Sequence, residues 1–259
     1  MIILFNRKID TIPMNIIFHI GRYFSLMFKT LRKPEKLRIY LKQVMAEIDS
    51  IGLNSVGIVA IVSVFMGAVL TIQMAINLVN PLIPKYLIGL SVRDTMILEF
   101  SSTVICLILA GRVGSNIASE IGTMRITEQI DALEMMGVNS PGYLILPKII
   151  AAIITFPLIN LLSIFLGIIG GYALTLITGI IPMPDYLYGL HYYFIPFYVT
   201  YSIVKMIVFA IIITSVSAYH GYYTHGGALE VGRSSTRAVV YSIILVLFFD
   251  LVLTQLLLT

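Results

Sequence analysis

The sequence is poor in charge: only 12% of its 259 residues are Asp, Glu, Lys or Arg, whereas 58% are hydrophobic. An ordinary soluble domain carries about 25% charged residues, so this composition excludes a water-soluble protein and indicates an integral membrane protein. Cysteine is almost absent as well. Because Cys106 is the only one, no intrachain disulfide can form and the redox compartment is unreadable. The amino terminus also lacks the pattern of a cleavable signal peptide.

Side chains that could build an active site are sparse. The four histidines show no zinc-ligand spacing such as H-E-x-x-H, and no nucleophile stands in a pattern with a base. We therefore expect no catalytic residues, no metal site and no nucleic-acid partner.

A glycine-rich stretch before the last apolar run resembles a phosphate-binding P-loop only weakly. Gly227, Gly232 and Arg233 have the spacing, but Arg stands where a P-loop has Lys and cannot simply replace it. A P-loop also needs a preceding strand and a nucleotide-binding domain, whereas here a membrane span follows. We predict a tight cytoplasmic turn and no ATP site in this chain.

Five apolar runs are long enough to cross a hydrocarbon core of about 30 Å, which needs about 20 helical residues. They are Val56–Val79, Met96–Val113, Ile149–Ile181, Phe194–Ala218 and Ala238–Leu258. The third is too long for one straight crossing. We expect it to tilt, to extend beyond the bilayer, or to bend near Gly167, Gly170 and Gly171.

The first 50 residues form a basic segment of a different kind. Apolar residues recur at helical spacing between Pro13 and Pro34, and a second apolar stripe follows Pro34. This pattern predicts an amphipathic helix in the membrane interface, with a soluble helix packed elsewhere as the alternative. The chain thus divides into an interfacial segment, 1–50, and a transmembrane domain, 51–259.

Positive charge predicts the orientation. Of the 17 Lys and Arg residues, fourteen flank the spans on one face, nine of them before the first span. Because cytoplasmic flanks retain positive charge, we expect a cytoplasmic amino terminus. An odd number of spans then places the carboxyl terminus outside.

Three ionisable residues interrupt the apolar runs: Glu99, Lys205 and Asp250. Their positions along the spans place all three in the outer half of the bilayer. Burial there is costly unless they pair or face water. They could line a polar cavity for a charged or zwitterionic headgroup, or form a structural acid–lysine pair. A third reading is a relay in a self-contained ion- or proton-coupled transporter.

Small residues recur every four positions at the end of the second run, at Ala110, Gly114, Ala118 and Gly122. This spacing lets helix backbones approach closely in lipid. The packing could occur within one chain or between two chains.

A short acidic segment lies between the second and third runs. Thr127 is the predicted N-cap, Glu128 and Gln129 fill the first turn, and Gly137 marks the end of the helix.

This helix, about residues 127–136, has two faces. Glu128, Asp131 and Glu134 form an acidic arc, and Leu133 lies on the opposite, more apolar side with Ile130, Gln129 and Met136. We predict a docking helix for a cytosolic partner, with a solvated loop helix as the alternative.

The blocks Ala110–Ala151, Gly226–Val240 and Phe248–Leu258 resemble the MlaE permeases, membrane subunits of bacterial ABC systems that move phospholipids together with MCE-domain proteins. The resemblance implies an all-α integral membrane protein of about five transmembrane helices in the bacterial inner membrane. An amphipathic interfacial helix would precede them, and a cytoplasmic coupling helix would lie between spans two and three.

The resemblance also implies partners. These are a second copy of the chain, a separate ABC ATPase that binds ATP and Mg²⁺ and receives the coupling helix, and an MCE-domain protein outside. A STAS-domain subunit accompanies some systems of the family. The positions of Glu99, Lys205 and Asp250 match the family's lipid cavity. A non-transporting membrane scaffold remains a third class of function.

Overall fold

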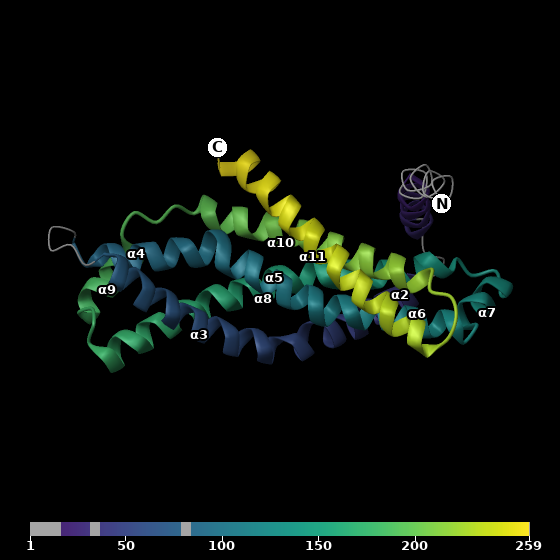
Figure 1. Ribbon diagram of the computed structural model, residues 1–259, viewed down its shortest axis with the longest axis horizontal. Coiled ribbons are helices and arrows are strands. Elements are labelled where there is room, and N and C mark those ends of the chain that lie inside the picture. Colours follow the sequence, from purple (N-terminus) through teal and green to yellow (C-terminus); the bar gives the residue numbers. More distant parts are fainter. Residues whose placement is uncertain (1–16, 32–36, 79–83, 259) are drawn as a thin grey trace, which may run out of the picture.

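The computed structural model describes residues 17–31, 37–78 and 84–258, and side chains from Tyr40 onward in the second of these ranges. Within these ranges the chain is helical and contains no strand. Figure 1 shows a long bundle with the short helices α4 and α9 at one end and α7 at the other. These are called the α9 end and the α7 end below.

The elements follow the chain in this order. A helix covers residues 17–30. After it come α2 (Leu37–Ile48), the π-helix η1 (Asp49–Leu53), α3 (Asn54–Asn77), α4 (Tyr86–Thr95), the π-helix η2 (Met96–Val104), α5 (Ile105–Leu109), the π-helix η3 (Ala110–Gly114), α6 (Ser115–Ile126), α7 (Gln129–Met135), α8 (Ser140–Thr178), α9 (Met183–His191), α10 (Phe197–Tyr222) and α11 (Ala228–Leu258).

Five helical rods are long and apolar enough to span a membrane, which confirms the predicted number. They are Tyr40–Asn77, Tyr86–Ile126, Ser140–Thr178, Phe197–Tyr222 and Ala228–Leu258. Most extend well beyond the apolar runs, because a helix satisfies its own backbone and need not end where hydrocarbon ends. The apolar runs therefore predict the number and order of the spans but not the residues at which the helices begin and end.

The third span is one continuous helix, α8, of 39 residues. At 1.5 Å per residue it is about 58 Å long, so it extends beyond a bilayer core of about 30 Å. Its glycines mark close packing against α3 and do not interrupt the helix. A Cβ at Gly67 of α3 would lie 1.8 Å from the carbonyl oxygen of Gly167. A Cβ at Gly170 would lie 2.1 Å from that of Val64.

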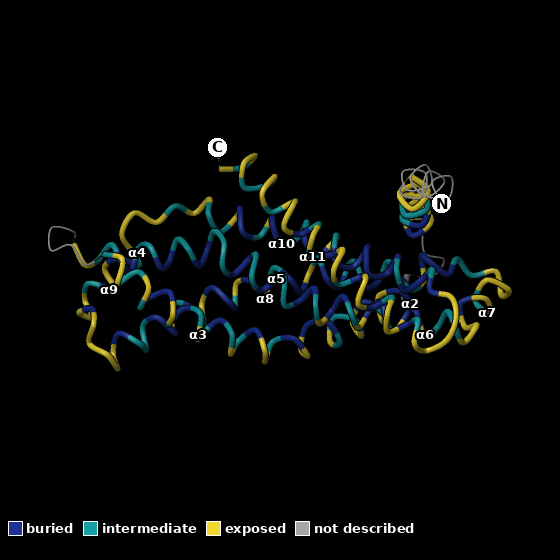
Figure 2. Tube along the Cα trace, viewed as in Figure 1, coloured by how far each residue is buried: buried dark blue, intermediate teal, exposed yellow. Residues whose placement is uncertain are grey.

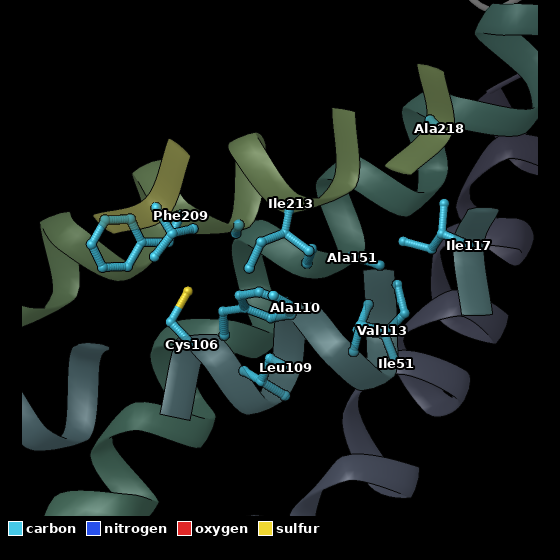
Figure 3. Packing of buried hydrophobic residues seen from close by; sticks show 14 of the residues in the cluster. Ile51, Cys106, Leu109, Ala110, Val113, Ile117, Ala151, Phe209, Ile213 and Ala218 are labelled. Carbon is cyan, nitrogen blue, oxygen red and sulfur yellow. The ribbon is translucent and has the colours of Figure 1, made fainter. Parts of the chain in front are cut away.

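The main hydrophobic core joins the second rod to α8 and α10. Figure 3 shows Cys106 and Ala110 of the second rod facing Phe209 and Ile213 of α10. Burial is uneven among the rods: in the most apolar stretch, 56% of α10 is buried but only 11% of α11. The carboxyl end of α11 stands away from the bundle in Figures 1 and 2.

The helix over residues 17–30 is seen end-on in Figure 1, so its axis crosses the long axis of the bundle. It is held against the end of α10. The Arg22 guanidinium lies 3.6 Å from the centre of the Tyr223 ring, and Tyr23 Oη donates to Ser215 Oγ at 2.7 Å. Phe24 and Phe28 are exposed. Residues 1–16 and 32–36 of the predicted interfacial segment lie outside the described ranges.

Candidate functional site

The three intramembrane charges meet in one cluster, called the Lys205 cluster below. Lys205 Nζ of α10 lies 2.5 Å from Asp250 Oδ1 of α11 and 3.2 Å from Glu99 Oε2 of η2. The Thr103 hydroxyl lies 3.2 Å from the Glu99 carboxylate and 3.1 Å from that of Asp250. Three separate spans thus contribute to a single polar site.

The members of this cluster differ in exposure. The Lys205 side chain is fully buried, that of Asp250 is 16% exposed and that of Glu99 is 42% exposed. With all three ionised, the cluster carries one net negative charge. Its exposed part is the Glu99 carboxylate, so an incoming group would meet an anionic acceptor first.

Helix α7 begins later than predicted. Its N-cap is Glu128, in the left-handed conformation with φ 61°, and Thr127 is not the N-cap. Thr127 ends α6 instead, where its hydroxyl donates to the Thr123 carbonyl at 2.8 Å. One left-handed residue separates α6 from α7 without a longer loop.

The other end of α7 agrees with the predicted stop. Gly137 has φ 78°, and its N–H donates to the Glu134 carbonyl at 2.9 Å. The Val138 N–H donates to the Leu133 carbonyl at 3.1 Å. These bonds close the last turn in the manner of a Schellman motif.

The acidic arc of α7 is partly used within the chain. Glu134 Oε1 accepts hydrogen bonds from Ser140 Oγ at 2.7 Å and Tyr222 Oη at 2.8 Å. Asp131 pairs with Arg125 at 2.6 Å. The first two bonds connect α7 to the start of α8 and the end of α10.

These hydrogen bonds stabilise the charged form of Glu134. The Ser140 hydroxyl contributes most and the Tyr222 hydroxyl next, and together they lower the pKa of the Glu134 carboxyl below 4.5. Glu134 is therefore a carboxylate at neutral pH and holds α7 in place.

The apolar side of α7 divides in two. Ile130 is fully buried against the bundle and Leu133 is half-buried, whereas Gln129 is exposed. Met135 and Met136 are 89% and 69% exposed at the end of the molecule. Sequence reasoning overlooked Met135. Two adjacent methionines before a helix-ending glycine were the available signal, since so short a helix cannot bury both.

The small-residue ladder packs within the chain. Ala110, Gly114, Ala118 and Gly122 are all buried. A Cβ at Gly114 would lie 2.9 Å from Ser217 Oγ of α10. Gly122 of α6 faces Val231 of α11 in the same way, so η3 and α6 lie close to α10 and α11.

Only the start of the glycine-rich stretch forms the turn that we predicted. Helix α11 begins at Ala228, so Gly232 and Arg233 lie inside it and only Gly227 precedes it. Arg233 pairs with Glu230 one turn earlier at 2.6 Å. The turn itself is made by Gly226, with φ 111°. Helix-forming residues after Gly227 carry the helix through Gly232.

A second buried lysine was not singled out from the sequence. Lys148 Nζ of α8 lies 2.6 Å from Glu47 of α2 and 2.8 Å from Glu120 of α6. The Lys148 side chain is 3% exposed. We call this group the Lys148 cluster. It fastens α2 to two of the spans.

Together the five spans, the intramembrane charge cluster and the projecting α7 define a multi-pass membrane protein of the permease class. The family described as Permease MlaE matches residues 44–256, so the chain belongs to the MlaE permease family.

Relatives agree with this assignment. The chain is 35% identical to a probable ABC transporter permease protein of Rickettsia bellii, over 92% of this chain and 91% of that one. It is 32% identical to one from Synechocystis, over 85% and 83%. It is also 29% identical to Arabidopsis thaliana protein TRIGALACTOSYLDIACYLGLYCEROL 1, chloroplastic, over 85% and 63%.

Proposed function

We propose that this chain is the permease subunit of a bacterial ABC system that moves phospholipids between membranes and is powered by a separate ATPase. Membership of the MlaE family supports the permease role. The relatives named as ABC transporter permeases support an ATPase partner. The name of the plant relative refers to a diacylglycerol lipid, which favours a lipid as the substrate.

The observation that carries the proposal is the position of α10 between two sites. Lys205 lies in the part of α10 toward the α9 end of the bundle. Tyr222, in the last turn of α10, binds Glu134 of α7. At 1.5 Å per residue the two residues are roughly 26 Å apart along the helix. A movement of α7 would therefore reach the charge cluster through one rigid element.

In this proposal α7 is the coupling helix that the ATPase holds. Met135 of α7 and its C-cap Met136 are large, exposed apolar residues, and methionine adapts well to a partner surface. Glu128 and Asp131 are exposed on the acidic arc of this segment and would give the contact its charge. ATP and Mg²⁺ would bind the partner.

The Lys205 cluster would receive the lipid headgroup. Glu99 offers an exposed carboxylate, which suits the ammonium group of a zwitterionic headgroup. Apolar faces of the spans are exposed nearby and would contact the acyl chains. Nucleotide-driven movement of α7 would repack the helices around this site and expel or admit lipid.

The remaining features of the proposal concern assembly. Because so little of α11 is buried within the chain, its apolar face is available to lipid or to a second copy, as a homodimer requires. Membership of the MlaE family favours the bacterial inner membrane, and charge placement favours a cytoplasmic amino terminus and a periplasmic carboxyl terminus. An MCE-domain protein would then meet the α9 end. A STAS-domain subunit would belong to the cytoplasmic side.

The test is reconstitution. The chain and its ATPase, placed together in liposomes, should move a fluorescent phospholipid only when ATP is added. Movement driven by an ion gradient without the ATPase would contradict the proposal and favour a self-contained coupled transporter. Unchanged lipid movement after Lys205→Met or Asp250→Asn, in protein that still folds, would favour a scaffold.

The docking helix has its own test. A Met135→Asp/Met136→Asp variant should lose copurification with the ATPase, as should variants that disrupt Leu133 or reverse Glu128 and Asp131. Leu229→Asp is the control, since Leu229 is 71% exposed at the same end but lies on α11. Equal copurification of all variants would contradict docking on α7.

A further inference from the structure

A polar cavity of about 460 Å³ lies between α3 and α6, apart from both the Lys205 cluster and α7. Its walls come from the two places where the chain forms π-helix near the α7 end. One wall includes Asn54 and Ser55, directly after η1, and the other includes Arg112 of η3 with Asn116 and Ser119 of α6. π-Helical turns inside α-helices occur frequently at functional sites.

Asn54 and Ser115 donate to backbone carbonyls of their own rods, but four other polar side chains of the lining are unused. Ser55, Arg112, Asn116 and Ser119 make no side-chain hydrogen bond or ion pair within the described ranges of the chain. Ser55 is notable because it is only 1% exposed and lines the cavity. Buried hydroxyls are normally hydrogen-bonded, so a buried one without a partner beside an open cavity indicates a ligand.

The charge of the lining favours an anion as the ligand of this cavity. Arg112 is the single charged residue among the described residues that line the cavity, and the other polar groups are hydroxyls and amides. Three carboxylates lie on the neighbouring helical turns: Glu47 and Glu120 bind Lys148, and Asp49, which begins η1, is not part of the lining. A guanidinium with neutral donors around it is a set that binds phosphate oxygens.

The position of the cavity along the spans indicates where the phosphate would come from. On the first rod it lies where the apolar run starts, just before Val56, and on the second where the run ends, at Val113. Arg112 is roughly 20 Å along the second rod from Glu99 at 1.5 Å per residue, toward the α7 end. Both rods thus place the cavity at the headgroup level of the leaflet on the α7 side.

We propose that this cavity binds the phosphate of an anionic phospholipid from the leaflet on the α7 side. Arg112 would pair with the phosphate oxygens, and Ser55, Asn116 and Ser119 would donate the remaining hydrogen bonds. The site is separate from the Lys205 cluster and would hold a resident lipid whether or not that cluster carries a transported one.

The experiment is a lipid titration of the delipidated full-length chain, read by native mass spectrometry with phosphatidylglycerol as the probe. Arg112→Gln should lose one tightly bound lipid, with affinity weakened about tenfold, as expected for a charge-assisted hydrogen-bonding partner. Ser119→Ala should weaken binding by a smaller factor. Because this substitution is milder, weaker binding in it would show that the loss in the Arg112 variant does not come from a folding defect.

Arg237→Gln is the matched control, because Arg237 is exposed at the start of the apolar run of α11 but does not line the cavity. Equal losses in the Arg112 and Arg237 variants would overturn the proposal, since any boundary arginine would then suffice. No loss in either variant would also overturn it.

Two further arms identify the occupant. Inorganic phosphate that displaces phosphatidylglycerol would support a phosphate site open to free phosphate, and failure to displace it would support a lipid-only site. A photo-crosslinker at Asn116 that captures a second copy of the chain in place of lipid would overturn the proposal. All these measurements need neither ATP nor transport, so they succeed or fail independently of the proposed function.

Discussion

Two lysines in this chain each hold two carboxylates, and they lie toward opposite ends of the bundle. Lys205 joins η2, α10 and α11, whereas Lys148 joins α2, α6 and α8. Both side chains are almost completely buried, at 0% and 3% exposed. Their surroundings differ: Lys205 interrupts a long apolar run, while Lys148 directly precedes the apolar run of its helix. Similar geometry therefore serves different purposes.

The different locations of the two clusters indicate what each one does. At Lys205 the lysine cancels charge in the apolar layer, where an unpaired carboxylate is costly. At Lys148 both carboxylates lie outside the apolar runs, so the lysine mainly fastens the short helix α2 to the spans. The first cluster should thus matter more for stability of the whole fold, and the second for local attachment.

Removing Lys205 should have the largest effect. Lys205→Met leaves the Glu99 and Asp250 carboxylates facing each other without a cation. Breaking a buried ion pair from one side costs about 3–5 kcal/mol, so we expect the free energy of unfolding in detergent to fall by about that amount. Denaturant unfolding followed by circular dichroism measures it.

The control is the triple variant Lys205→Met/Glu99→Gln/Asp250→Asn, which removes the carboxylate charges as well. It should recover much of the lost stability. A Lys205→Met protein as stable as the parent would show that the cluster is not a buried ion network.

Removing Lys148 should cost less. The side chains of Glu47 and Glu120 are 21% and 45% exposed, close to the 16% and 42% of Asp250 and Glu99, but they lie outside the apolar runs, where water can partly replace the lost lysine. We expect Lys148→Met to lower the free energy of unfolding by about 1–3 kcal/mol, less than Lys205→Met. Hydrogen exchange should increase in α2 first. Unchanged exchange in α2 would contradict its attachment through Lys148.

The two lysines also differ in how far the sequence predicts them. Lys205, Glu99 and Asp250 stand out because each interrupts an apolar run, although the sequence does not say which pairs form. Lys148 looks like an ordinary positive flank of a span. Its partners lie 28 and 101 residues away, so only the packing of α2, α6 and α8 brings the three together.

The same limit holds for α7. Residue spacing predicts a helix there and Gly137 predicts its end, and both are present. The left-handed Glu128 is not predictable from residue preference, because a non-glycine residue adopts positive φ only where the surrounding chain requires it. Likewise, the cavity at Arg112 depends on two rods meeting at one height.

The group formed by Glu134, Ser140 and Tyr222 can be compared with the two lysine clusters, because it contains a carboxylate but no lysine. Ser140 and Tyr222 hold Glu134 with hydroxyls alone, which lowers the pKa of the Glu134 carboxyl below 4.5. Since its folded pKa is depressed, its contribution to stability is present above pH 4.5 and is lost as the pH falls through the lower folded pKa. Glu134 is exposed, so we expect less than about 1 kcal/mol.

Unfolding of the parent and of Glu134→Gln, measured between about pH 7 and about pH 3, tests this prediction. The stability advantage of the parent should stay constant near neutral pH and shrink in acid. An advantage that grows toward low pH would contradict it.

The smallest effect should come from an ion pair that is short but exposed. Arg233 and Glu230 lie 2.6 Å apart on α11, with side chains 60% and 37% exposed. If burial and not distance determines the energy of these charge clusters, Glu230→Gln should change the free energy of unfolding by about 0.5 kcal/mol or less. A double-mutant cycle with Arg233→Gln isolates the pair. A coupling energy between Glu230 and Arg233 as large as the loss expected for Lys148→Met would mean that contact distance, and not exclusion of water, determines how much these ion pairs stabilise the fold.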